Sequence, residues 1–131
     1  MSGPRSAETP ALRWLRLSLV WLWLWTALVS LWEWHGQSMA LLAPLPDALA
    51  PLKPALIGAG ALADAAIGLW LWWPPGRAAY LTALLTMAAM TALATWVQPA
   101  WWLHPFGPLA KNVPLAAALL VLWRSASAPP R

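Results

Sequence analysis

Four long apolar stretches constrain this chain more than any other feature of its sequence. They run approximately over Leu12–Trp32, Ala55–Trp73, Ala78–Val97 and, less cleanly, Leu109–Trp123. About 18 to 20 apolar residues in a helix cross the hydrocarbon core of a bilayer, so the first three stretches are each long enough to span a membrane. The pattern predicts an all-α integral membrane protein, a four-helix bundle that uses residues 11–124.

The composition excludes an ordinary water-soluble domain. Of the 131 residues, 61% are hydrophobic and 9% are charged, whereas soluble domains carry about 25% charged residues. The segments 1–10 and 125–131 are rich in Pro, Ser and Ala, and we expect them to be mobile tails. The absence of cysteine excludes disulfides and Cys-ligated zinc or iron–sulfur sites within this chain.

The basic residues predict an orientation in the membrane. The net charge is +4, but Lys and Arg are scattered rather than clustered as on a nucleic-acid-binding face, so no nucleic-acid partner is expected. One side of the predicted spans carries most of them: Arg5, Arg13, Arg16, Arg77, Arg124 and Arg131. The other side keeps Lys53 and Lys111. The positive-inside rule therefore predicts that both termini of this multi-pass protein are cytoplasmic.

One carboxylate, Asp64, lies in the middle of the second apolar stretch. Placing a charge at this depth costs at least about 2.5 kcal/mol, so Asp64 needs a partner or a task. Gly60, Asp64 and Gly68 recur every four residues, which predicts an inward face where helices approach closely. Lys111 enters the fourth span from the same outer side, and an Asp64–Lys111 ion pair is expected to offset part of the cost.

This polar group supports two interpretations. In the first, Asp64 and Lys111 form a buried pair that fixes helix register and does nothing else. In the second, they belong to a polar pocket in the outer half of the bundle that binds a small polar or redox-active ligand. Asn112, Glu33 and His104 lie near the same end and are candidates for that pocket. The sequence leaves both interpretations open.

Tryptophan is the other unusual feature, with thirteen in the chain. Trp14, Trp21, Trp25 and Trp32 follow one another at spacings of seven, four and seven, and therefore share one stripe of the first helix. The stripe favours an aromatic ridge that packs or faces lipid. The alternative is a stacking wall for a flat ring such as a quinone, with Trp21, Trp25 and Trp32 as the candidates.

The two histidines do not predict a metal or haem site. His35 and His104 both fall near the outer end of the predicted spans. Two isolated histidines in tryptophan-rich interface segments are typical of hydrogen-bonding surface residues, and a third protein ligand is not evident. We therefore expect no metal.

The start of the fourth span is ambiguous, because prolines interrupt Gln98–Pro108. If Asn112 caps the helix, only about 18 Å of helix remains before Arg124, which is short of a core of about 30 Å. Either the helix begins nearer Leu109, or residues 99–110 re-enter the membrane against protein. We expect the earlier start.

The run from Trp102 to Leu115, WLHPFGPLAKNVPL, resembles the signature of the DoxX-like family of small four-helix membrane proteins. The tryptophan-rich first span ending at Ser30–Trp34, the Gly60–Gly68 segment and Trp96–Pro99 also resemble that family. The resemblance reaches from Leu12 to Trp123. It points to Asp64, His104, Lys111 and Asn112, and less strongly to Glu33, as the matching polar residues.

The resemblance implies a multi-pass protein of the bacterial inner (cytoplasmic) membrane with a role in membrane redox chemistry. Members of the family occur alone or attached to NAD(P)-binding proteins, and related proteins take part in thiosulfate:quinone oxidoreduction. The first hypothesis is an accessory subunit of a membrane redox system, not catalytic alone, with a pocket for a quinone or small ligand. The alternative is a non-catalytic membrane anchor or assembly partner of a soluble NAD(P)-binding oxidoreductase. A small proton-coupled transporter, built as a homo-oligomer or a gated bundle, is the third choice.

Overall fold

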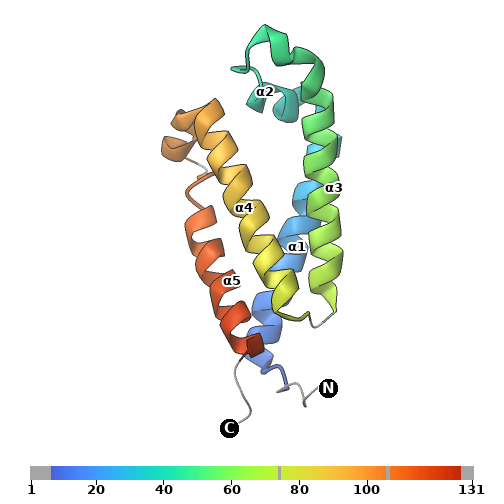
Figure 1. The fold of residues 1–131 in the computed structure, drawn as a ribbon, viewed down its shortest axis with the longest axis vertical. Helices are drawn as coiled ribbons and strands as arrows, with labels where there is room; N and C mark the ends of the chain where they lie inside the picture. The colour runs from blue at the N-terminus through green and yellow to red at the C-terminus, as the bar shows by residue number, and fades with distance from the viewer. Residues whose placement is uncertain (1–6, 74, 106, 128–131) are drawn as a thin grey trace.

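The computed structural model describes residues 7–73, 75–105 and 107–127, and within them the chain forms helices and irregular segments without strands. Four helices make the bundle: α1 (Pro10–Trp32), α3 (Lys53–Trp72), α4 (Arg77–Val97) and α5 (Asn112–Ser127). The first three are long and apolar enough to cross a membrane, and α5 is a shorter apolar helix. The ends of α1 and α5 nearest the two termini lie at the same end of the bundle (Figure 1).

Helix α1 begins at Pro10, two residues before the start that hydropathy suggests. Thr9 is its cap, since the Thr9 hydroxyl accepts a hydrogen bond from the Leu12 backbone N–H at 3.3 Å, and proline is well suited to the first helical position. The structure thus describes residues 7–10 of the segment 1–10 that the sequence predicts to be a mobile tail, and the last two of them form the start of α1. Residues 1–6 of that segment lie outside the described residues.

The connection from α1 to α3 covers the end of the bundle away from the termini. It contains a π-helical turn η1 (Trp34–Ser38), a short α2 (Met39–Leu41) and a 3-10 helix η2 (Asp47–Leu52). The backbone kinks at Gly36, where φ is −102° and ψ is −107°. Ser38 is buried, and its hydroxyl donates to the Ser30 carbonyl at 2.8 Å, which folds the connection back onto α1.

Helices α1 and α3 pack along most of their length, and Gly68 marks a point of close approach. A Cβ atom built at Gly68 would lie only 2.7 Å from the Leu24 Cδ2 atom and 3.3 Å from the Leu24 backbone nitrogen. The two backbones can therefore approach this closely only because position 68 has no side chain. Small residues at such contacts are typical of helices packed in lipid.

Helix α5 begins at Asn112, three residues after the start that we expect near Leu109. The 3-10 helix η3 (Pro99–Leu103) precedes it, and turns connect η3 to α5. In these turns the Lys111 backbone N–H donates to the Gly107 carbonyl at 3.0 Å. Gly107 has a positive φ of 59°, a conformation that favours glycine. With 16 residues, α5 is about 24 Å long. It also continues to Ser127, so the described part of the segment 125–131 is helical.

The apolar core lies in the half of the bundle nearest the termini. Ten buried residues form it: Leu19, Val20, Trp23, Ile67, Leu71, Ala79, Tyr80, Ala83, Leu119 and Leu122. The pair α1 and α3 meets the pair α4 and α5 through this core, and α3 and α4 then diverge toward the opposite end (Figure 1). The two pairs thus leave space in the half of the bundle away from the termini, which is where Asp64 lies.

Candidate polar cavity

The half of the bundle away from the termini contains a cavity of about 310 Å³ that Asp64 lines. Its walls come from all four bundle helices, from α2 and from the segment before α5. Most of the lining is apolar, with polar groups from Asp64, Thr26, Thr86, Thr91, Lys111 and Asn112. Pockets that bind small molecules are typically apolar with a few polar groups that fix orientation, and this cavity has that character.

Asp64 reaches the cavity from α3, on the same face as Gly60 and Gly68. Lys111 lines the same cavity from the segment before α5. Among the residues that the structure describes, no ion pair within 4.0 Å and no hydrogen bond joins Asp64 to another side chain. Asp64 and Lys111 thus share a cavity without closing a contact across it.

Asn112 is held in place by α4. Its side-chain amide donates to the Thr91 hydroxyl at 2.7 Å, and that hydroxyl donates to the Met87 carbonyl at 2.7 Å. One turn further along α4, the Thr95 hydroxyl accepts from the Trp102 indole N–H at 2.9 Å. These bonds fasten the start of α5 and the η3 segment to α4. They leave the Asn112 side-chain oxygen without a hydrogen bond to the described residues.

Glu33 and His104 do not line the cavity, although both are candidates from the sequence. The Glu33 carboxylate caps the η1 turn by accepting from the Gln37 backbone N–H at 3.4 Å. The His104 ring lies against the Trp101 ring, with centroids 5.1 Å apart. Of the predicted pocket residues, the structure therefore brings together Asp64, Lys111 and Asn112.

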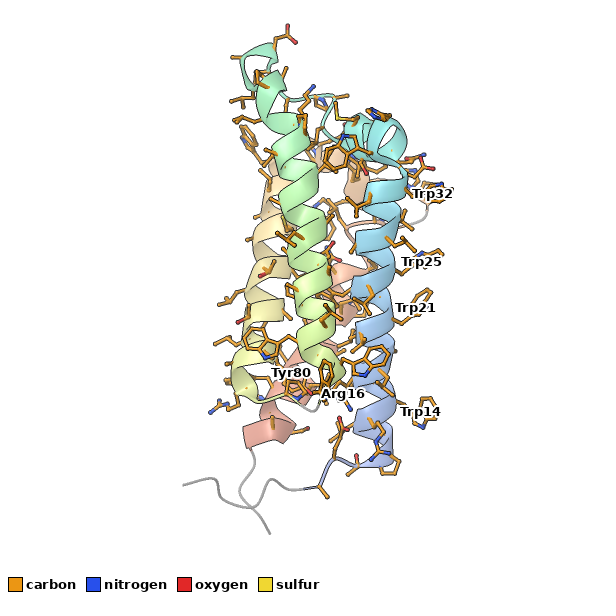
Figure 2. The ribbon with its side chains drawn as sticks, turned by 90° about the vertical axis from the view of Figure 1, so that its right-hand side faces the viewer. Trp14, Arg16, Trp21, Trp25, Trp32 and Tyr80 are labelled. Carbon is orange, nitrogen blue, oxygen red and sulfur yellow. The ribbon has the colours of Figure 1, made fainter. Side chains whose placement is uncertain are left out.

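The tryptophan stripe lies on the outside of the bundle. Figure 2 shows Trp14, Trp21, Trp25 and Trp32 pointing away from the other helices along one side of α1. Their exposed fractions run from 50% to 83%. Trp21 and Trp25 stack on each other, with centroids 5.8 Å apart and planes 8° apart. The three predicted ring-stacking residues therefore sit apart from the Asp64 cavity.

Arg16 is a buried charge that the sequence interpretation assigns only to the positive-inside pattern. It is 4% exposed and turns inward from α1 toward Tyr80 (Figure 2). Its guanidinium donates to both Glu8 carboxylate oxygens, at 2.7 and 3.0 Å, and to the Leu71 carbonyl at 2.9 Å. It also donates to the Trp72 carbonyl. Arg16 therefore fastens the end of α3 to the start of α1.

The sequence contains a signal for this burial. Arg16 shares a helical stripe with Leu19, Val20, Trp23 and Ala27, at the spacing of one helix face, and all five are buried. An arginine on the buried face of a helix needs a carboxylate or unpaired backbone carbonyls as hydrogen-bond acceptors, because an unpaired buried charge is costly. The last carbonyls of a helix have no partner within that helix, and those of α3 accept here.

Glu8 completes this contact from outside the membrane-spanning part of α1. The hydrogen bond from Arg16 lowers the pKa of Glu8 below its usual value. Arg13 adds a longer contact to the same carboxylate at 3.8 Å, with an Arg13 side chain that is 62% exposed.

The geometry shows no metal centre within residues 7–73, 75–105 and 107–127, where no three His, Asp or Glu side chains gather closely enough to hold an ion. Comparison of the sequence with models of known protein families identifies the family of the chain. The model of the DoxX-like family matches residues 20–120, which is most of the chain. The chain belongs to the DoxX-like family.

Membership of the DoxX-like family makes this an integral membrane protein, in agreement with its long apolar helices. The matched residues include the three cavity residues Asp64, Lys111 and Asn112, whereas Glu8 and Arg16 precede the DoxX-like match. Neither the curated proteins nor the solved structures contain a match to the chain.

Proposed function

We propose that this DoxX-like protein is an accessory subunit of a membrane redox system, and that its outer cavity holds a quinone or a similar small ligand. The observation that carries the proposal is Asp64, a carboxylate within a membrane-length helix that lines a largely apolar cavity without an ion pair or hydrogen bond to the described residues. Ionisable residues at this depth are costly and commonly mark sites of function.

The donors around the cavity suit a ring that carries carbonyl oxygens. The Lys111 ammonium and a side-chain N–H of Asn112 can donate to such oxygens, and Asp64 can hold or release a proton beside them. The apolar walls suit the ring itself. A bound quinone would supply reversible two-electron, two-proton chemistry. The residues of the chain would bind and orient the ring, and the Asp64 carboxylate would accept or release a proton beside it.

Binding of decylubiquinone to the purified protein in detergent tests this proposal. The wild type is expected to bind it and to carry quinone extractable from the host membrane, and Asp64→Asn and Lys111→Gln are each expected to weaken binding at least tenfold. Glu33→Gln is the matched control, because Glu33 lies outside the cavity. Wild-type-like binding by both cavity variants would refute the role of the cavity.

The end of the bundle near the termini supports the proposed orientation and a cytoplasmic partner. Arg13, Arg77 and Arg124 lie in the terminal turns of α1, α4 and α5 at this end, and the Arg77 guanidinium packs over the Trp123 ring at 4.2 Å. Among the described residues Glu8 is the acid at this end, and Arg16 binds it.

The positive-inside rule thus favours cytoplasmic termini in a bacterial inner membrane, and the same basic end could receive a soluble NAD(P)-binding oxidoreductase. Activity of alkaline phosphatase fused after Ser127 would contradict this orientation, because that enzyme folds only outside the cytoplasm.

A further inference from the structure

The cavity lies beside a narrow contact between α3 and α4. Gly60 is on α3, one turn from Asp64 and on the same face. A Cβ atom built at Gly60 would lie 3.6 Å from the Cε atom of Met90 on α4, and Met90 also lines the cavity. Because α3 and α4 diverge beyond their shared turn (Figure 1), the Met90 side chain bridges the two helices where they would otherwise be apart.

This bridge is a movable one. Met90 is 49% exposed, and methionine has three rotatable bonds and an unbranched chain that adapts to its surroundings. Gly60 contributes no side chain to the contact. A change in the Met90 rotamer would therefore widen the passage to Asp64 without disturbing the buried core, which lies at the other end of the bundle.

The outside of this passage is apolar. Leu56, one turn before Gly60 on α3, is 38% exposed, and Leu93, one turn after Met90 on α4, is 36% exposed. In a membrane these side chains face hydrocarbon, so a molecule that arrives here comes from the lipid and not from water. The cavity, at about 310 Å³, is near the lower limit for ligand pockets of about 300 to 1,000 Å³. It has room for a headgroup but not for a long tail as well.

We propose that the contact between Gly60 and Met90 is the closed state of a lateral portal. The portal opens when Met90 changes rotamer, and a lipid-soluble amphiphile then inserts its polar headgroup beside Asp64 while its apolar tail stays in the portal and the bilayer. The proposal rests on the proposed function, since it assumes that the cavity binds a ligand. It adds the class of ligand, a headgroup with a membrane-dissolved tail, and the route of entry.

Two probes and one substitution separate the tail from the headgroup. Decylubiquinone carries an apolar tail, and 2,3-dimethoxy-5-methyl-1,4-benzoquinone has the same headgroup without the tail. Gly60→Leu fills the portal from α3, at a position outside the cavity lining. It is expected to weaken decylubiquinone binding at least tenfold in proteoliposomes, while binding of the tailless probe changes less than twofold. Leu85→Trp is the matched control on α4, because Leu85 is 59% exposed and outside the cavity, and it should change neither affinity.

Leu93→Trp narrows the portal from α4, also at a position outside the cavity lining, and should reproduce the Gly60→Leu result if that variant does not fold. Circular dichroism and gel filtration establish folding for each variant. Equal loss of both probes, unchanged binding of decylubiquinone, or the same loss in Leu85→Trp would overturn the portal and leave the cavity proposal standing. A wild type that binds neither probe would instead overturn the proposed function, and the portal with it.

Discussion

Replacing Arg16 with glutamine should destabilise the protein more than any other single loss of charge at the end of the bundle nearest the termini. The substitution removes the donors to the Glu8 carboxylate and to the Leu71 and Trp72 carbonyls. Removing one member of a buried charge pair costs about 3 to 5 kcal/mol. Because the Glu8 side chain is still 18% exposed, its carboxylate can be hydrated when Arg16 is lost. We therefore expect a loss of about 3 kcal/mol in the free energy of unfolding, the lower end of this range.

Unfolding in mixed micelles, followed by tryptophan fluorescence as the denaturing detergent fraction rises, would measure this loss. Arg13→Gln is the matched control, since Arg13 is 62% exposed and its contact to Glu8 is 3.8 Å long. An exposed pair contributes about 1 kcal/mol or less. If Arg16→Gln unfolds at the same point as Arg13→Gln, the buried contact contributes nothing beyond its surface neighbour and the reasoning fails.

Three further outcomes are expected. The pKa of Glu8 is lowered in the folded state. Glu8 therefore stabilises the protein fully above its unfolded-state pKa, and this stabilisation is lost as the pH falls through the lower, folded-state pKa. Glu8→Gln should accordingly reduce the loss of stability at acid pH. Gly68→Ala should cost about 1 to 3 kcal/mol from overpacking against α1, while Gly76→Ala, with nothing within 4 Å, should unfold like the wild type. Asn112→Ala and Thr91→Val should each cost about 0.6 to 1.7 kcal/mol, and the double variant should cost no more than the larger single one, because one hydrogen bond joins the pair.

Much of this architecture follows from hydropathy and spacing. The long apolar runs specify the membrane helices because only a helix satisfies its backbone in lipid. The repeat Gly60, Asp64, Gly68 indicates the inward face because side chains four apart share one side of a helix. That Asp64 and Lys111 reach one cavity also follows from topology and depth. The gap between their charged groups depends on how far the helix pairs diverge, which no local pattern specifies.

Other features depend on tertiary contacts that the sequence expresses only weakly. The stripe of Trp14 and Trp21 is conspicuous because its rings are large, yet it faces outward, and the less prominent stripe through Arg16 and Trp23 is the buried one. Asn112, the first residue of α5, bonds through its side chain to Thr91 on α4. A partner on another helix has no signal at this position in the sequence.

The unequal packing of the two ends gives the molecule the outline of a wedge. Its helices converge where the core lies and spread where the cavity lies (Figure 1). In a membrane a wedge would occupy more area in one leaflet than in the other, so the angle between the helix pairs would be expected to respond to lateral pressure in the broader leaflet. Phospholipids that crowd that leaflet would favour the narrower form, and occupation of the interior would favour the wider one. The lipid composition of the bilayer would then influence the same angle between the helix pairs that a molecule in the cavity would influence.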